Sequence, residues 1–95
     1  MSDANPRNKL VQSPQWQAVR KSLLGKWKEQ PTWCCSQLKR YLGSVASASN
    51  DKIKVVMNYL TGTGFRTGRI KHPCISALRT QMSSEIKKRK AQKKW

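Results

Sequence analysis

The stretch that most clearly predicts the fold is SNDKIKVVMNYL, residues 49–60. Its apolar residues recur at intervals of three and four, which is the spacing of one face of an α-helix. The residues on that face are Ile53, Val56, Met57 and Leu60. Ser49 or Asn50 can cap the first turn, and Asp51 places a negative charge where a helix N-terminus favours one. The stretch therefore predicts a short amphipathic helix.

The same spacing occurs upstream of this helix in two segments. In residues 14–29 the apolar stripe consists of Trp16, Val19, Leu23, Leu24 and Trp27. Ser13 and Pro14 are a favourable N-cap and first-turn pair. In residues 32–42 the stripe consists of Cys34, Leu38, Tyr41 and Leu42, and Gly43 is placed to end that helix. Two further helices are therefore expected before residue 49.

Downstream, residues 61–72 contain three glycines, Gly62, Gly64 and Gly68, which disfavour a helix and predict a loop or a short β-hairpin. A fourth helix begins at His72 and Pro73, with a stripe made by Ile75, Leu78, Met82 and Ile86. The predicted fold is mostly α: four helices, a Gly-rich basic loop or hairpin, and a basic C-terminal extension. This order of elements is also that of a winged helix-turn-helix, although residues 43–49 are longer than a compact helix-turn-helix turn.

The chain has 95 residues, enough for one domain, and its 20 Lys and Arg against 4 Asp and Glu give a net charge of +16. We expect a flexible N-terminal arm at 1–12, a single helical domain at 13–86 and a basic tail at 87–95. So large a positive charge favours a polyanionic partner, above all nucleic acid. The leading hypothesis is a small DNA-binding protein, a regulatory or accessory factor that contacts duplex DNA.

Three groups of residues are candidates for nucleic-acid contact. Lys52, Lys54 and Asn58 on the third helix could enter a DNA groove, since Asn and Lys can pair with base edges. Arg66, Arg69 and Lys71 in the glycine-rich loop could hold phosphates. The C-terminal run adds non-specific contacts through Lys87, Lys88, Arg89, Lys90, Lys93 and Lys94.

The tryptophans fall into two classes. Trp16, Trp27 and Trp33 have helical spacing and are expected in the core, whereas Trp95 stands among lysines and is expected as an exposed anchor for a partner or a base.

Cysteine usage predicts free thiols that fill the core. Cys34 and Cys35 are adjacent and Cys74 makes an odd third, so a disulfide scaffold is not expected. With His72 these could be proposed as zinc ligands, but adjacent cysteines lack the usual ligand spacing. With few, scattered carboxylates and one histidine, no catalytic constellation is predicted. We therefore expect neither an enzyme nor a cofactor.

Two alternatives to DNA binding stay open: an RNA-binding or ribonucleoprotein component, and a module or inhibitor that binds an acidic protein. A homodimer through the fourth helix is possible. The N-terminus lacks the apolar segment of a secretory signal, and no stretch could cross a bilayer, so we expect an intracellular protein, cytoplasmic or nucleoid (nuclear if eukaryotic), with no membrane or small-molecule partner.

Overall fold

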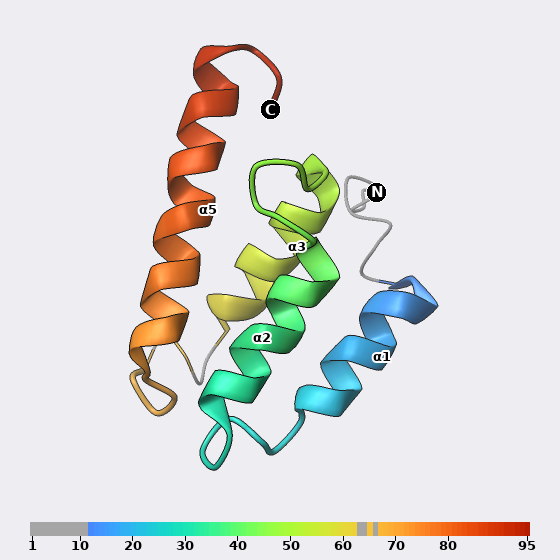
Figure 1. The fold of residues 1–95 in the computed structure, drawn as a ribbon, viewed down its shortest axis with the longest axis vertical. Helices are drawn as coiled ribbons and strands as arrows, with labels where there is room; N and C mark the ends of the chain where they lie inside the picture. The colour runs from blue at the N-terminus through green and yellow to red at the C-terminus, as the bar shows by residue number, and fades with distance from the viewer. Residues whose placement is uncertain (1–11, 63–64, 66) are drawn as a thin grey trace.

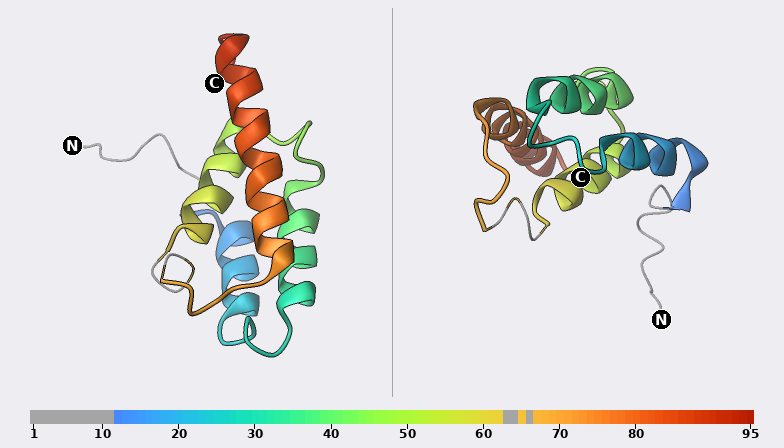
Figure 2. Two further views of the ribbon diagram at one scale, coloured as in Figure 1. Left: turned by 90° about the vertical axis from the view of Figure 1, so that its left-hand side faces the viewer. Right: turned by 90° about the horizontal axis from the view of Figure 1, so that it is seen from below.

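The computed structural model describes residues 12–62, 65 and 67–95, and it is mostly helical (Figure 1). Within these ranges four α-helices follow one another: α1 (Pro14–Leu23), α2 (Pro31–Leu42), α3 (Asn50–Leu60) and α5 (Pro73–Ala91). α2 packs against each of the other three helices, and α5 also packs against α3. Figure 1 and the right-hand view of Figure 2 place α1 and α5 at opposite edges of the bundle. The prediction of a mostly helical fold is confirmed.

Local capping explains where the helices begin. The Ser13 hydroxyl accepts from the Trp16 N–H (3.1 Å), as the sequence predicted. The Ser49 hydroxyl accepts from the Lys52 N–H (3.2 Å), so Ser49 is the cap of the two candidates, Ser49 and Asn50. At the start of α5 the ring Nδ1 of His72 accepts from the Cys74 N–H (3.1 Å). Side chains thus satisfy one otherwise unpaired donor at each of these three N-termini.

The first helix is shorter than expected. It was predicted over residues 14–29, but it ends at Leu23, because Gly25 adopts a positive φ of 75° that the helix cannot continue. Leu24, expected on the apolar stripe, is 79% exposed as a result. Trp27 is still buried, from the turns that follow the helix.

The core is formed by the predicted apolar stripes together with an aromatic cluster. The cluster joins Trp16, Trp27, Tyr41, Tyr59 and Phe65, with neighbouring ring centroids 5.1–6.3 Å apart. The Trp27 indole N–H donates to the Tyr59 hydroxyl at 2.7 Å. Trp33, also expected in the core, is instead 37% exposed, with the Lys26 ammonium 5.8 Å from its ring centroid.

α5 is the longest described helix, with 19 residues and a length of about 28 Å. Its final turns project beyond the other helices (Figure 2). No helix in the described part of the chain is long and apolar enough to span a membrane.

Candidate nucleic-acid interface

The side of α5 that faces away from the bundle carries hydroxyls and cations. It is hollowed by a depression of about 410 Å³, lined by Ser76, Arg79, Thr80, Ser83, Ser84 and Lys87. These six residues are called the outer face of α5 below. Their spacing along the helix places them on one side. None of them is a carboxylate, so the local charge is uniformly positive.

The hydroxyls of the outer face differ from others in the protein. Ser22, Ser36 and Thr61 each donate to a backbone carbonyl three residues earlier. Among the described residues no such partner engages the four hydroxyls of the outer face, and neither Arg79 nor Lys87 has an ion-pair partner there. The face therefore presents several unoccupied donors to an external acceptor.

Two neighbouring hollows extend this surface. A depression of about 270 Å³ at the start of α5 shares Ser76 and Arg79 with the outer face and adds Lys71 from the loop. On the other flank, a groove of about 700 Å³ runs between α5 and the α2–α3 connection, with Lys39 and Lys88 among its lining residues.

The basic C-terminal run is divided by the structure. Lys87, Lys88 and Lys90 are exposed on the last turns of α5, and Lys93 and Lys94 are exposed beyond it, so these five remain accessible.

Arg89, predicted to contact nucleic acid, instead binds the protein itself. Its Nε lies 2.8 Å from the Glu85 carboxylate, its Nη1 donates to the Asn50 side-chain oxygen (2.7 Å), and its Nη2 donates to the carbonyls of Val45 and Ala46 (both 3.2 Å). Four acceptors occupy the guanidinium because its planar fork can bond in several directions at once. Arg89 is therefore a structural residue that ties α5 to the α2–α3 connection.

The chain end returns to α3. The Asn50 side-chain amide donates to the Lys94 carbonyl at 2.7 Å, and the Lys54 ammonium lies 5.0 Å from the centroid of the Trp95 ring. Trp95 is half-buried and packs against the core, so the expectation of a freely exposed anchor is wrong. Trp95 packs there because burying its indole against the apolar surface of the bundle lowers the free energy of the folded state.

The three candidate residues of α3 do not share one face. The Lys52 ammonium donates to the Tyr41 carbonyl (3.3 Å) and lies 5.1 Å from the Tyr41 ring centroid, on the α2 side. Two residues along a helix is a rotation of about 200°, which places Lys54 on the opposite side, over Trp95. Asn58 is exposed. Most of α3 is enclosed, with Ile53, Val55, Val56 and Leu60 buried.

In the glycine-rich loop Arg69 and Lys71 are exposed, whereas Arg66 lies outside the described residues. Phe65 and Ile70 are half-buried against the core. The described part of this loop contains turns, bends and a helical residue at Phe65 but no strand, so a hairpin or wing stays a prediction.

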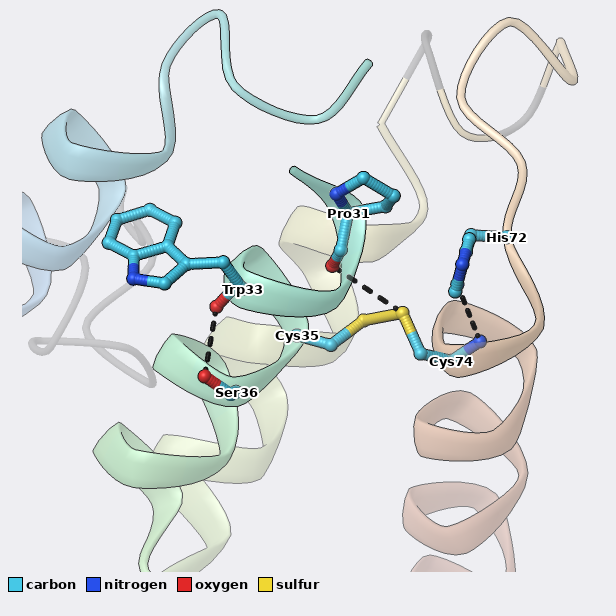
Figure 3. The surroundings of a disulfide bond; sticks show 6 residues. All are labelled: Pro31, Trp33, Cys35, Ser36, His72 and Cys74. Atoms are coloured by element: carbon cyan, nitrogen blue, oxygen red, sulfur yellow. Dashed lines mark hydrogen bonds between the residues drawn. A yellow bond between two sulfur atoms is a disulfide. The ribbon is translucent and has the colours of Figure 1, made fainter. Parts of the chain in front are cut away.

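The cysteines correct the expectation of free thiols. Cys35 and Cys74 form a disulfide, with Cα atoms 6.4 Å apart, that joins the N-terminal turns of α2 and α5 (Figure 3). Sequence spacing could not show this, since 39 residues separate the two and only the packing of α2 on α5 brings them within bonding range. Two of the four possible zinc ligands are thereby occupied by each other.

Cys34 remains a free, buried thiol. Burial raises its pKa, partly opposed by the positive charge of Lys26. It is therefore mostly a neutral thiol at neutral pH, which is the unreactive form.

The outer face of α5 was not predicted from the sequence, because the predicted helix was defined by its apolar stripe. Its signal was present: Ser76, Thr80, Ser83 and Lys87 stand at i, i+4, i+7 and i+11, the same periodicity in polar residues.

Comparison with protein-family models, with curated proteins and with solved structures finds no match to this chain.

Proposed function

We propose that the protein binds nucleic acid through its sugar–phosphate backbone, with the outer face of α5 as the contact surface and duplex DNA as the ligand. The observation that supports this most is the combination, on one carboxylate-free face, of hydroxyls and two cations that have no partner among the residues that the structure describes. Phosphate oxygens accept from Ser and Thr hydroxyls and from Lys and Arg. The net charge of +16 supplies long-range attraction to the same ligand.

Duplex DNA is favoured over RNA by the kind of element that carries the surface. α5 is about 28 Å long, one of its sides is exposed, and its last turns project from the bundle. The major groove of B-DNA admits an α-helix, whereas the major groove of A-form RNA is too deep and narrow for side chains to read.

The proposed contacts have two tiers. Arg79 and Lys87 bind phosphates from the outer face, and Arg69 and Lys71 extend this contact from the loop. The exposed lysines of the C-terminal run, Lys88, Lys90, Lys93 and Lys94, add attraction without sequence preference. Of the α3 candidates, Asn58 is exposed and could add a contact. Lys52 and Lys54 are left out, because Tyr41 engages the ammonium of Lys52 and the ammonium of Lys54 lies over the Trp95 ring.

Finer parts of the hypothesis stay predictions: a wing built from the loop, a regulatory or accessory role, and a cytoplasmic or nucleoid location. A homodimer is compatible with the proposal where its contact surface lies away from the outer face of α5.

Binding of a fluorescently labelled duplex, followed by anisotropy at several salt concentrations, tests the proposal. The logarithm of affinity should fall with the logarithm of salt by about 0.9 per phosphate neutralised. The double variant R79Q/K87Q should therefore lower the slope by about 2, one for each lost contact. The matched control R20Q/K21Q removes the same charge from α1 at the opposite edge of the bundle, and the slope should change by much less.

Equal effects of the two double variants would show that binding follows total charge rather than this surface. Tighter binding of a structured RNA than of the duplex would overturn the choice of DNA. A protein partner that survives exhaustive nuclease treatment in stoichiometric amount would favour the acidic-protein alternative.

A further inference from the structure

The hollow of about 270 Å³ at the start of α5 differs in character from the outer face that it joins. Its lining comes from the loop and the first turns of α5: Phe65, Gly68, Ile70, Lys71, His72, Ile75, Ser76 and Arg79. The volume lies just below the range of pockets that hold whole drug-sized ligands, so there is room for one compact group. We call it the loop-side hollow.

One part of the lining is apolar and firmly backed. Phe65 packs edge-on against Trp27 and Tyr59, with ring centroids 5.1 and 5.5 Å apart. Ile75 is buried, and Ile70 packs against the core. The aromatic cluster thus holds Phe65 in place and gives the hollow an apolar wall suited to a flat ring.

The other part is cationic and hydroxylic. Lys71 and Arg79 stand in the lining with Ser76, and none of the described lining residues is a carboxylate. The helix N-terminus itself contributes little, because Pro73 has no N–H and the N–H groups of Cys74, Ile75 and Ser76 already bond to His72. Attraction for an anion here comes from side chains.

A ligand that matches this lining has a flat, mostly apolar ring joined to a negatively charged group. A nucleotide meets both requirements, since aromatic side chains stack on bases and cations hold the adjoining phosphates. Ser76 and Arg79 belong to both the hollow and the outer face. A base in the hollow would therefore be continuous with a backbone that lies along α5.

We infer that the loop-side hollow takes one unpaired base of the bound nucleic acid, with its phosphates held by Lys71 and Arg79. This rests on the proposed function and adds a ligand preference to it. A fully paired duplex must break a pair to fill the hollow, whereas a bulged nucleotide is already unpaired. The protein thus prefers DNA with an extrahelical nucleotide to the perfect duplex.

The test compares a perfect duplex with the same duplex carrying a one-nucleotide bulge of 2-aminopurine. Affinity is measured by anisotropy, and the emission of 2-aminopurine reports the surroundings of the base. The wild-type protein should bind the bulged DNA at least about fivefold more tightly, the lower end of the effect of base–aromatic stacking. Binding should also change the 2-aminopurine emission.

Two variants of the same helix locate the effect. S76F fills the hollow, and S84F places the same ring on the outer face away from it; both positions are exposed, so neither disturbs the core. S76F should abolish the preference for the bulge and the change in emission, whereas S84F should retain both. Circular dichroism of both variants verifies the fold.

Equal affinity of the wild-type protein for the two DNAs, or equal behaviour of S76F and S84F, would overturn this inference while leaving backbone binding intact. Failure to bind either DNA would overturn the proposed function, and this inference with it.

Discussion

Loss of the Cys35–Cys74 disulfide should strongly destabilise the protein. The bond closes a loop that spans 39 positions of sequence and contains most of α2, all of α3 and the glycine-rich loop. In the chain-entropy model, breaking a bond that closes a loop of this length raises the entropy of the unfolded chain, which lowers the free energy of unfolding by about 4 kcal/mol at 25 °C. For a domain of this size, 1 kcal/mol corresponds to about 4 to 8 °C in Tm, so the expected fall is roughly 15 to 30 °C.

A contact in the folded state slightly opposes this loss. The Sγ of Cys74 lies 3.5 Å from the carbonyl oxygen of Pro31 (Figure 3). A disulfide sulfur carries no hydrogen, but the reduced thiol can donate there weakly. One weak thiol hydrogen bond offsets only a small part of the stability that is lost with the disulfide. Reduction is therefore still expected to destabilise the protein.

The assay is thermal unfolding by circular dichroism, with and without a phosphine reductant, together with counting of free thiols in the denatured protein. The oxidised protein should show one thiol, from Cys34, and the reduced protein three. C74S should unfold near the temperature of the reduced wild-type protein and should not respond to the reductant. C34A leaves the bond in place and should keep the full response.

A fall of less than about 3 °C on reduction of the wild-type protein would refute the loop-entropy reasoning. Loss of the reductant response in C34A would show that Cys34 rather than Cys35 pairs with Cys74, and a response that persists in C74S would show a bond that does not include Cys74. The result also bears on the expected location, because a reducing cytosol keeps thiols reduced and would hold the protein in its less stable form.

Three further predictions concern stability. Tyr59→Phe removes the acceptor of the Trp27 indole N–H and should lower the free energy of unfolding by about 1 to 2 kcal/mol in urea titrations. Tyr41→Phe removes a buried hydroxyl that has no partner among the described residues, so it should be neutral or stabilising. Equal losses of stability in the two variants would contradict this contrast. Arg89→Met leaves Glu85 without its partner and should lower the free energy of unfolding by about 2 to 4 kcal/mol. The control Lys88→Met changes an exposed residue and should lower it by almost nothing. Similar Tm values for these two variants would refute the structural role of Arg89. Burial raises the pKa of Tyr59 and of Tyr41 above the ordinary value of 10.0, so the folded state favours the neutral phenols. Their contribution to stability is complete below pH 10 and should be lost as the pH rises through the folded-state pKa values. Urea midpoints measured from pH 8 to 11 should therefore fall, and the fall should be shallower in Tyr59→Phe.

Much of the secondary structure could be predicted because its causes are local. The spacing of Ile53, Val56 and Leu60 and the Ser49 cap predicted α3. The end of α1 was missed because Trp27 continues the helical spacing, whereas Gly25 ends the helix with a positive φ and the core still buries Trp27.

The candidate site was less accessible to such reasoning. Basic residues were expected to be free, and the lysines of the C-terminal run are exposed. Arg89 and Lys52 are engaged by acceptors on other elements, from residues up to 44 positions away. Sequence periodicity predicts which side of a helix a residue occupies, but it does not predict which groups of the neighbouring elements contact that residue.

The sequence by itself determined the four helices, most of their boundaries and the excess of positive charge, since propensity, capping and charge act over a few residues. Tertiary structure alone decided the Cys35–Cys74 bond, the role of Arg89, the burial of Trp95 and the side of α5 that stays free. Each of these depends on groups distant in sequence that meet only when α5 docks on α2 and α3. The charge of +16 is thereby divided between cations that stabilise the fold and cations that remain available to a ligand.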